Sequence, residues 1–568
     1  MRIIILNIKN AWMWRKESDL NKSDLFEYLS DFLKFTLLAL AIFLFGSHES
    51  ANPKIGNTKI EFNSSEFRQK MYSEANKAMN TRRDLVDNLV YKFYAERKYM
   101  PAWTVNFKTN TAYNKLLNIL KSANNYGLNP STYSVNELSD LDMKMKNAYN
   151  DKDKLNIRVR LEETATSSAL LFMINIAAGI GISDTALSTI ELTKNYSAFL
   201  NQNIQLENLE QEIISIQPQS LQYKLLQAAL VKFLIREKLN DQLFSPEEIL
   251  KTNGLLEKIL MNQGYLDNSR LNDTIKIATA LMNFQRFHDI EQTGKPDHST
   301  LSLLGASSYE RYNQIAVNLD RLRKDELLKE NYILVNIPEF MLYYFNSKGQ
   351  KTDYTVVVGK KITPTPLLTS HIERIVANPH WTVPNSIAVN EMIPKIQTDS
   401  TYLSRNGFKI VDKDAKAIDE AEMDWSTMNS SNFKYYIRQD NSEKNALGLL
   451  KFLFPNEFSV YLHDTPSKQY FKKGLRAYSH GCVRVENPGK LAQQIIASYC
   501  SDDDKELSIE KVIKAGKQKD IRLKEPLSIF IKYYTCTADS LENIYYHPDV
   551  YSYDQAAIGQ LFAKSVQD

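Results

Sequence analysis

The chain has 568 residues, with 43% hydrophobic and 24% charged residues and a net charge of +3. This length exceeds what a single hydrophobic core supports, so about two to four domains are expected. The composition is ordinary for a soluble globular protein, and the near-neutral charge gives no sign of a nucleic-acid partner. The three cysteines, Cys482, Cys500 and Cys536, match neither a zinc site nor a disulfide framework. We interpret Cys500 and Cys536 as small buried side chains, with a bridge between them as the alternative.

An apolar run at residues 35–45 follows Lys34 and precedes Gly46-Ser47. About eleven apolar residues suit a secretory signal and fall short of the roughly 20 that span a bilayer. However, the preceding segment is long and no clear cleavage site follows, so an uncleaved anchor is the second interpretation. We therefore expect residues 1–46 to be a signal peptide or membrane anchor, and the rest of the chain to be exported. A buried core helix is the alternative.

Residues 47–65 are polar and are typical of a linker, and residues 66–250 show mostly helical spacing of apolar positions. The almost wholly apolar stretch 169–182 is too short to span a membrane, so we predict a buried core helix there. Residues 251–305 indicate a compact three-helix unit whose last helix begins after Asp297. In this unit we interpret Phe284 and Phe287 as core residues, with sugar-stacking rings as the alternative.

After a charged helix at residues 309–329 the pattern changes to short β-rich runs. The strand candidates are 332–337, 353–358, 374–377, 458–462 and 528–533. Between residues 391 and 446 lies a polar, helix-tending insertion. A long insertion just before a catalytic strand is often a lid that controls substrate access, so we predict a lid, with a passive surface excursion as the alternative.

The segment that carries the chemistry is residues 479–484, with the sequence SHGCVR. A thiol is a strong nucleophile only as thiolate, and a nearby imidazole such as that of His463 is the usual means of ionising it. We therefore predict that Cys482 is a nucleophile ionised by a neighbouring imidazole, with His463 and His480 both available as bases. Gly481 allows a tight turn and leaves its N–H free to face a developing oxyanion. Arg484 supplies a fixed positive charge suited to a substrate carboxylate, and a structural ion pair is the alternative.

His463 ends the strand candidate 458–462, and adjacent strand residues point to opposite faces. The Asp464 side chain should therefore face away from the imidazole, and a backbone carbonyl or the Ser479 side chain would orient the ring instead. His480 lies two residues before Cys482, so an extended backbone would place both on one side. Whether catalysis requires His480 stays open.

The spacing of His463 and SHGC, followed by VRVENP at residues 483–488, resembles the signature of the L,D-transpeptidases, cysteine enzymes that cross-link bacterial peptidoglycan. The similarity covers most of residues 85–555. Segments resembling the large multidomain subgroup are NPHWTVPNSI at 378–387, PK at 394–395, NALG at 445–448 and KF at 451–452. LMNFQRF at 281–287 and GKPDHSTL at 294–301 resemble a peptidoglycan-binding module. FY at 93–94, PAW at 101–103 and YGLNP at 126–130 resemble that subgroup's scaffold.

The resemblance implies a multidomain α+β protein with four parts. These are the signal or anchor at 1–46, a helical scaffold at 66–250, a peptidoglycan-binding-like domain at 251–305, and a mainly-β, β-sandwich-like catalytic domain at 330–555 with its capping insertion at 391–446. The partners implied are peptidoglycan stem peptides and glycan in the periplasm, with membrane contact through the amino-terminal segment.

The resemblance also implies a two-step acyl transfer without metal or organic cofactor. Cys482 attacks the donor stem before its terminal D-alanine, and the thioester passes to an acceptor amine to give a 3→3 cross-link. His463 is the base, His480 and Gly481 assist, and substrate contacts the side chains of Arg484, Ser479 and Tyr461. Acylation of Cys482 by carbapenems is a further expectation.

Three other function classes are compatible with the residues. The first is a metal-dependent peptidase with His463, His480 and Cys482 as zinc ligands. The second is a non-catalytic wall-binding protein that acts through residues 251–305. The third is a carboxypeptidase or D-amino-acid exchange enzyme of the same fold, in which water or a free D-amino acid replaces the acceptor amine.

Overall fold

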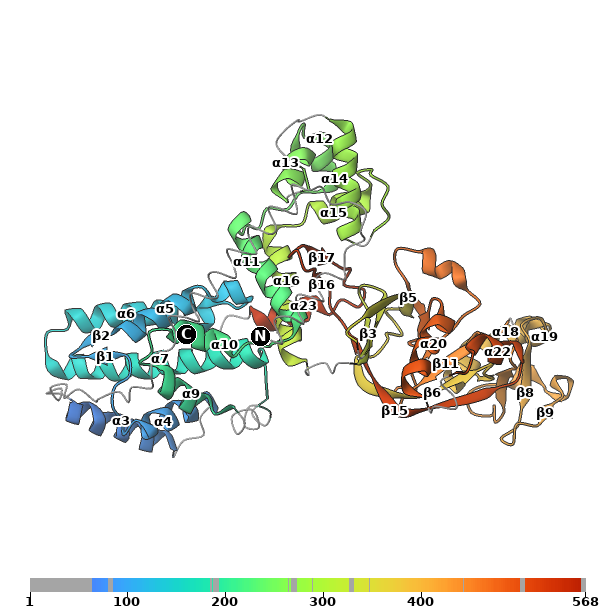
Figure 1. Cartoon of the computed structure of the whole chain (residues 1–568), viewed down its shortest axis with the longest axis horizontal. Coiled ribbons are helices and arrows are strands. Elements are labelled where there is room, and N and C mark those ends of the chain that lie inside the picture. Colours follow the sequence, from blue (N-terminus) through green and yellow to red (C-terminus); the bar gives the residue numbers. More distant parts are fainter. Residues whose placement is uncertain are drawn as a thin grey trace. The chain divides into compact units, whose positions relative to one another are not determined.

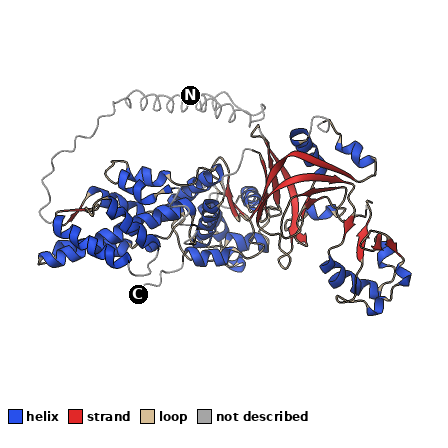
Figure 2. Ribbon diagram, turned by 90° about the horizontal axis from the view of Figure 1, so that it is seen from below, coloured by secondary structure: helices blue, strands red, loops and turns tan. Residues whose placement is uncertain are grey.

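The computed structural model describes residues 64–79, 85–183, 186, 194–263, 265–266, 273–288, 290–325, 331–346, 348–442, 444–500 and 506–562. The predicted signal peptide or anchor at residues 1–46 lies outside these ranges. Within them, no helix combines the length and the apolar character that crossing a membrane would require. Helices dominate the first half of the chain, and most strands belong to the second half (Figures 1 and 2).

The scaffold region is built from helices around one apolar core. They are α3 (Ser64–Met79), α4 (Leu85–Glu96), α5 (Thr111–Lys121), α6 (Val135–Asn147), α7 (Asp151–Ala178), α9 (Tyr196–Asn203) and α10 (Leu209–Ser215). The buried side chains of the next helix, α11 (Leu221–Arg236), belong to a second apolar core. The apolar stretch predicted as a core helix is the buried second half of α7. The helix ends at Ala178, four residues earlier than predicted, because Gly179 takes a positive φ of 91°.

A buried carboxylate explains the PAW segment of the scaffold. Glu162, fully buried in α7, accepts hydrogen bonds from the N–H groups of Ala102 (2.8 Å) and Trp103 (3.0 Å). The hydroxyls of Thr104 (2.6 Å) and Tyr94 (2.7 Å) also donate to it. A buried charge is tolerated when several donors satisfy it, so these contacts hold the PAW loop against α7.

The next region contains α12 (Pro246–Lys251), α13 (Leu255–Asn262), α14 (Thr274–Phe287) and α15 (His298–Leu304), which share a small core. Asp297 caps α15 by accepting from the Thr300 N–H (2.9 Å), which confirms the predicted start signal. Phe284 is fully buried, as predicted, and the Phe287 side chain lies outside what the structure describes.

Helix α16 (Ser308–Lys324) leads into a nine-stranded sheet. In chain order the strands are β3 (Tyr332–Asn336), β4 (Met341–Phe345), β5 (Lys351–Gly359), β6 (Leu368–Ala377), β11 (Leu450–Leu453), β12 (Leu462–His463), β13 (Ala477–Ser479), β14 (Val483–Val485) and β15 (Lys519–Lys532). The spatial order is β13-β5-β14-β12-β11-β6-β15-β3-β4, and β4 also pairs with β5. The mainly-β character matches the prediction, but the strands form one sheet that closes on itself where a sandwich-like arrangement was expected. Helix α20 (Pro488–Tyr499) contributes its apolar face to the same core.

The insertion predicted at 391–446 is part of a folded unit with its own sheet and core, which begins about ten residues earlier than predicted, at Trp381. Its elements are β7 (Trp381–Thr382), α17 (Asn385–Ile387), the π-helical turn η3 (Ala388–Met392), α18 (Ile393–Thr398), α19 (Tyr402–Arg405), β8 (Phe408–Val411), β9 (Ala417–Ile418), η4 (Glu420–Glu422), η5 (Trp425–Thr427) and β10 (Tyr436–Gln439). The helix-tending interpretation is thus only partly right, because four strands pair in the order β7-β10-β8-β9. Their pairing depends on partners as distant as Gln439 and Trp381, almost sixty residues apart, which local periodicity does not reveal.

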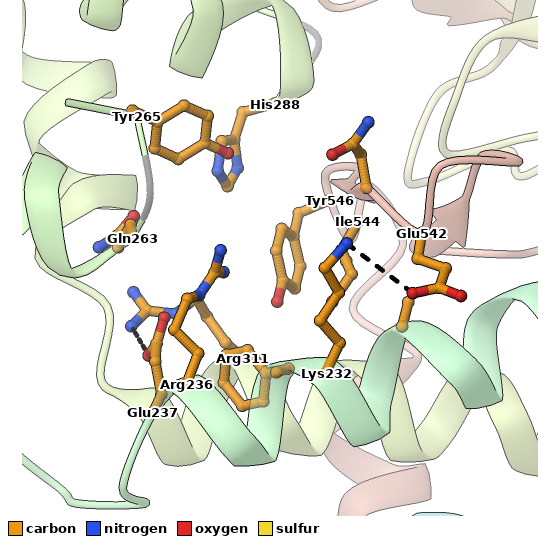
Figure 3. Close-up of a pocket in the computed structure, with 13 residues that line it drawn as sticks. Lys232, Arg236, Glu237, Gln263, Tyr265, His288, Arg311, Glu542, Ile544 and Tyr546 are labelled. Atoms are coloured by element: carbon orange, nitrogen blue, oxygen red, sulfur yellow. Dashed lines mark hydrogen bonds and ion pairs between the residues drawn. The ribbon is translucent and has the colours of Figure 1, made fainter. Parts of the chain in front are cut away.

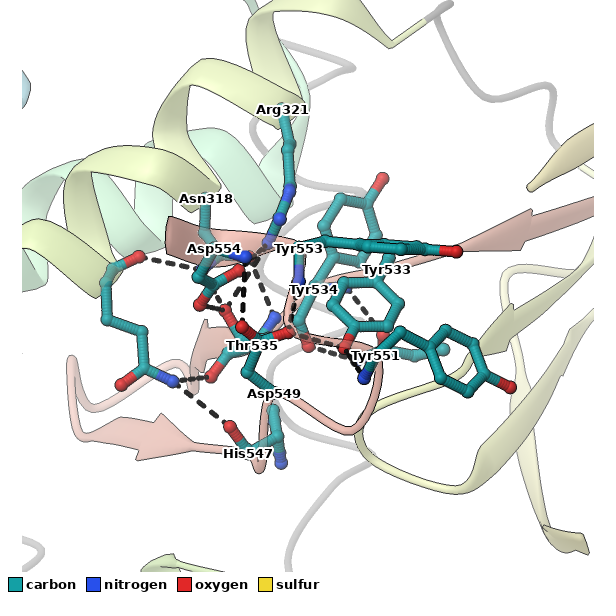
Figure 4. A network of polar contacts seen from close by, with 12 residues as sticks. Asn318, Arg321, Tyr533, Tyr534, Thr535, His547, Asp549, Tyr551, Tyr553 and Asp554 are labelled. Atoms are coloured by element: carbon teal, nitrogen blue, oxygen red, sulfur yellow. Dashed lines mark hydrogen bonds and ion pairs between the residues drawn. The ribbon is translucent and has the colours of Figure 1, made fainter. Parts of the chain in front are cut away.

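The last segment folds back onto α16 through β16 (Cys536–Ala538), β17 (Ile544–Tyr546) and α23 (Asp554–Leu561). Figure 4 shows the polar network that joins them. Asn318 of α16 exchanges two hydrogen bonds with Thr535 (2.8 and 2.9 Å), and Arg321 pairs with Asp554 (2.7 Å). Cys500 and Cys536 are buried and are not joined by a disulfide, which confirms their interpretation as core side chains.

Candidate active site

Strand register places five side chains on one face of the sheet. His463 of β12 lies opposite Lys451 in the antiparallel β11 and beside Arg484 in the parallel β14. Paired residues share a face, as do residues two apart along a strand, so Tyr461 and Cys482 join them. The intervening residues of these strands point into the apolar core. The structure therefore brings together the predicted nucleophile, base and carboxylate-binding residue.

The turn before the nucleophile is closed by Ser479. Its hydroxyl donates to the Cys482 carbonyl (2.5 Å) and accepts from the Gly481 N–H (3.2 Å). Gly481 has a φ of 115°, a conformation that favours glycine. Its N–H was predicted to be free for an oxyanion, but it is occupied by Ser479. Among the described residues, the Cys482 N–H has no hydrogen-bond partner, which leaves it as the donor that a substrate oxygen can use.

A buried threonine, Thr365, holds this turn in place. Thr365 donates its hydroxyl to the Gly481 carbonyl (2.8 Å) and accepts from the Gly359 N–H (2.9 Å). The Thr365 N–H in turn donates to the hydroxyl of Tyr551 (3.0 Å), which donates to the Gly359 carbonyl (2.9 Å). Tyr551, in the carboxyl-terminal segment, therefore supports the turn before Cys482 through Thr365. Sequence reasoning missed both Thr365 and Tyr551, since neither is near the motif in the chain.

His463 is held in one orientation by a backbone oxygen. Its imidazole is only 5% exposed, and Nδ1 donates to the Asp464 carbonyl (2.5 Å). A carbonyl only accepts, so the proton of a neutral ring resides on Nδ1 and Nε2 is free to accept one. This is one of the two arrangements predicted for the third catalytic role.

The Asp464 carboxylate serves a different loop, as strand alternation predicted. It accepts from the Leu449 N–H (2.9 Å) and pairs with Lys468. Gly448 lies against it with a φ of 59°, and a Cβ there would approach the carboxylate to 2.3 Å. The NALG segment therefore needs its glycine because the Asp464 carboxylate fills the adjacent space.

Burial sets the protonation states of Cys482 and His463. It raises the pKa of the Cys482 thiol above its ordinary value, although hydrogen bonds from Tyr461 and the charge of Lys451 act in the opposite direction. Burial, together with the Arg484 charge, lowers the pKa of His463 to about 3. Both groups are therefore neutral at neutral pH. The ionised resting sulfur that we predicted is not what this site favours.

Tyr461 and Lys451 complete the surroundings of the sulfur. The Tyr461 hydroxyl lies close to Cys482 and to Trp381, the first residue of β7, and both act on its pKa, which burial raises. Its ring lies edge-on to His463, with centroids 5.7 Å apart, and Lys451 Nζ lies 3.9 Å from its centre. Desolvation lowers the pKa of Lys451, and the nearby Cys482 opposes that shift. The sequence offered Lys451 only as part of a resemblance; its register opposite His463 shows its place in the site.

Arg484 is mostly buried and has no carboxylate partner within the described ranges. Its Nε is a buried atom without a hydrogen-bond partner. Desolvation lowers its pKa, and the nearby Tyr470 and Cys482 oppose that shift. The structural ion pair considered from sequence is therefore not formed, and the guanidinium remains available to an anion.

His480 contacts the insertion. Its Nε2 lies 2.7 Å from a carboxylate oxygen of Glu391, and both side chains are partly exposed. His463, in contrast, is buried beside the Asp464 carbonyl. The two histidines therefore lie in different surroundings. Within the part of the chain that is described, no three His, Cys, Asp or Glu side chains are grouped as metal ligands, and His463, His480 and Cys482 do not form such a group.

Comparison with known proteins identifies the domain that carries this site. Residues 330–500 match the family described as the L,D-transpeptidase catalytic domain, and residues 88–230 match a scaffold domain. Residues 330–500 are therefore similar to L,D-transpeptidase catalytic domains. It is also 31% identical over 242 residues to a Haemophilus influenzae protein named "Putative L,D-transpeptidase". That match covers 43% of this chain and 48% of the relative, so the chain spans about half the length of the curated protein it matches. The five side chains on the shared face of the sheet all lie within the matched segment, residues 330–500. They are Lys451, Tyr461, His463, Cys482 and Arg484.

Proposed function

We propose that this L,D-transpeptidase domain transfers the acyl group of a peptidoglycan stem peptide through Cys482 and forms 3→3 cross-links. The observation that carries the proposal is the shared face of Cys482, His463 and Arg484, with Nε2 of His463 left free to accept a proton. A nucleophile, a base and an anion-binding group are the parts that acyl transfer from a carboxylate-bearing peptide requires.

In the first step, Nε2 of His463 takes the thiol proton as the Cys482 sulfur attacks the carbonyl that precedes the donor's terminal D-alanine. The tetrahedral oxyanion accepts a hydrogen bond from the Cys482 N–H, and one such donor typically contributes about 2.7–4 kcal/mol. Collapse breaks the peptide bond, and the departing D-alanine amine takes the proton from His463. A thioester on Cys482 remains.

In the second step, the side-chain amine of another stem peptide attacks the thioester. His463 accepts a proton from that amine and returns it to the departing sulfur, so the enzyme regains its neutral thiol. Both steps start from a neutral imidazole, which the lowered pKa of His463 provides across the neutral range. No charge has to be separated in the resting enzyme.

Substrate binding is assigned to the groups around the sulfur. We assign a donor carboxylate, from diaminopimelate or D-alanine, to Arg484, because the guanidinium has no acidic partner among the residues described. Tyr461, placed between the sulfur and Trp381, would line the donor channel. Ser479 shapes the turn through backbone contacts, so its effect on substrate is indirect.

The insertion is proposed to act as the lid. Two contacts join it to the reacting groups: Glu391 with His480, and Trp381 with Tyr461. A movement of the insertion would break both, which would couple access for the substrate to the surroundings of Cys482. In this proposal His480 is a positioning residue that reports the closed lid.

The setting of the reaction is the periplasm, with residues 1–46 as signal or anchor and peptidoglycan as the partner. The experiment that tests the function is incubation of the full-length chain with purified sacculi, followed by mass spectrometry of the muropeptides. New 3→3 dimers support cross-linking, and their absence with Cys482→Ala serves as the control. Tripeptides alone would assign a carboxypeptidase, and exchanged tetrapeptides the D-amino-acid exchange activity. Unchanged muropeptides with retained sacculus binding would point to a wall-binding protein.

A further inference from the structure

Figure 3 shows a polar cavity of about 130 Å³, and none of the side chains around Cys482 lines it. Segments far apart in the chain line it: Arg236 at the end of α11, Tyr265 and His288 from the α12–α15 region, Arg311 of α16, and Tyr546 of β17. All five lie outside the segments matched to the scaffold and catalytic domains. No function described so far uses this cavity.

His288 is the group that indicates a ligand. Its side chain is 5% exposed, and its Nδ1 is a buried atom with no hydrogen-bond partner among the described residues. The ring stacks on Tyr546, with centroids 5.3 Å apart, and Figure 3 shows it directed towards the space between Tyr265 and Tyr546. Burial and the charge of Arg311 lower the pKa of His288 to about 3, so the ring is neutral. A buried polar atom is normally hydrogen-bonded, so its partner is expected to come from outside the chain.

The cavity also offers uncompensated positive charge. Arg311 is fixed, because it donates to Glu237 (2.8 Å) and to the Ala306 carbonyl (2.9 Å), yet its buried Nε has no partner. Arg236 is exposed at the same cavity and forms no ion pair with a described residue. Glu237 neutralises one of the two guanidiniums, so a single negative charge would balance the pair.

We propose that this cavity binds the carboxylate end of a peptide, with the carboxylate between Arg236 and Arg311 and the adjoining amide against His288. Its volume is below the roughly 300–1,000 Å³ of pockets that enclose whole drug-sized ligands, so it admits the end of a longer molecule. The identity of the peptide rests on the proposed function, since the donor stem ends in a D-alanine carboxylate. Free D-alanine, released by the first step, carries the same group.

Histidine-selective NMR on the full-length chain tests this binding. The Cys482→Ala background prevents turnover, and a His288→Gln variant assigns the His288 resonance. Three probes are compared: a stem tetrapeptide ending in D-alanine, the same peptide with its terminal carboxylate amidated, and D-alanine alone. The proposal predicts that the free-acid tetrapeptide shifts the His288 resonance and the amide does not. A shift by D-alanine at similar concentration assigns the site to the released product; a shift by the tetrapeptide alone assigns it to the stem.

Arg236→Gln is the decisive variant, because Arg236 is exposed and its loss should leave the fold intact. We expect it to weaken tetrapeptide binding about tenfold or more, since hydrogen bonds to charged groups are the strong ones. Lys251→Gln, an exposed cation on α12 that does not line the cavity, should leave the affinity unchanged. The proposal is overturned if neither acid shifts His288, if the amide shifts it equally, or if Arg236→Gln binds as tightly as its parent.

The failure of this proposal is separable from failure of the proposed function. Acylation of Cys482, followed by intact mass in an Arg236→Gln chain that retains its cysteine, should proceed at the parental rate. Acylation without His288 shifts would leave the catalytic account standing and remove the cavity proposal. Shifts of the His288 resonance without acylation of Cys482 would remove the catalytic account. They would leave the cavity as a carboxylate-binding site.

Discussion

The backbone carbonyl of Asp464 holds the His463 imidazole, while the carboxylate of the same residue caps the loop at Leu449. One residue thus orients the His463 imidazole through its main chain and stabilises a neighbouring turn through its side chain. In the proposed mechanism the carbonyl takes the orienting role of a triad's third member, without placing a second charge beside the buried ring.

Replacing the carboxylate should therefore test stability more than catalysis. We expect Asp464→Asn to retain acylation of Cys482 within about threefold, because the carbonyl is unchanged and an amide oxygen can still accept from Leu449. His463→Ala should lower acylation by roughly 10²–10⁴-fold, the usual contribution of a positioned base. Rates of acyl-enzyme formation by intact mass compare the two. A loss in Asp464→Asn as large as that in His463→Ala would assign the carboxylate to catalysis.

The pH dependence of the thiol follows from the two pKa shifts. Because the pKa of Cys482 is raised, its thiolate fraction should be small at pH 7 and should still increase above pH 9. Because the pKa of His463 is lowered to about 3, its neutral form should persist from pH 5 upwards. The difference in thiolate ultraviolet absorbance between the wild type and Cys482→Ser measures this titration. Lys451→Met should move it to higher pH, since the ammonium favours the thiolate. A thiolate already complete at pH 6 would show an imidazolium–thiolate pair instead.

Arg484 should act on substrate affinity through its charge and its fork of donors. We expect Arg484→Gln to lower kcat/KM for the donor tetrapeptide at least about tenfold, as for other hydrogen-bonded charge pairs. Arg484→Lys keeps the charge without the bidentate geometry, so its kcat/KM should lie between those of the wild type and Arg484→Gln. Donors amidated at the D-alanine or at the diaminopimelate carboxylate identify the group that Arg484 binds. When the amide replaces the carboxylate that Arg484 contacts, the wild type and Arg484→Gln should use that donor equally poorly. If Arg484→Gln lowers kcat/KM equally for the free-acid donor and for both amidated donors, Arg484 does not bind a carboxylate.

The support of the nucleophile turn predicts a further effect at Thr365. Thr365→Val keeps the shape but loses the hydroxyl that joins Gly359 and Gly481, at a cost of about 1–3 kcal/mol for the buried groups left unpaired. The melting temperature and the acylation rate should both decrease. Thr365→Ser retains the hydroxyl and is the matched control. Equal acylation by the valine and serine variants would show that the turn holds its geometry without this contact.

Much of the site could be predicted because its determinants are local. The spacing of SHGC after His463 correctly predicted that these residues belong to one site, and strand alternation gave the direction of the Asp464 side chain. Gly481 was correctly placed in the turn, but its N–H was assigned to an oxyanion because the competing Ser479 hydroxyl depends on how the turn closes. The ionised sulfur was wrong for a related reason: burial, which sets the pKa values of both partners, is not visible in a motif.

The features that the sequence did not reveal depend on distant pairings. Thr365 and Tyr551 reach the nucleophile turn from segments more than sixty residues away on either side. The contact between Glu391 and His480 joins the insertion to the motif, and the closure of the sheet rests on the pairing of β4 with β5. Each of these needs the folded chain, since the same side chains elsewhere would be ordinary surface or core residues.

The most direct test of the whole account is the intact mass of the purified chain after brief incubation with a donor tetrapeptide or a carbapenem. The account predicts one covalent adduct, located by peptide mapping on Cys482 and absent in Cys482→Ala. With the tetrapeptide, the added mass should equal the donor minus D-alanine, as thioester formation requires. An unmodified chain, or an adduct that persists when Cys482 is replaced, would contradict it.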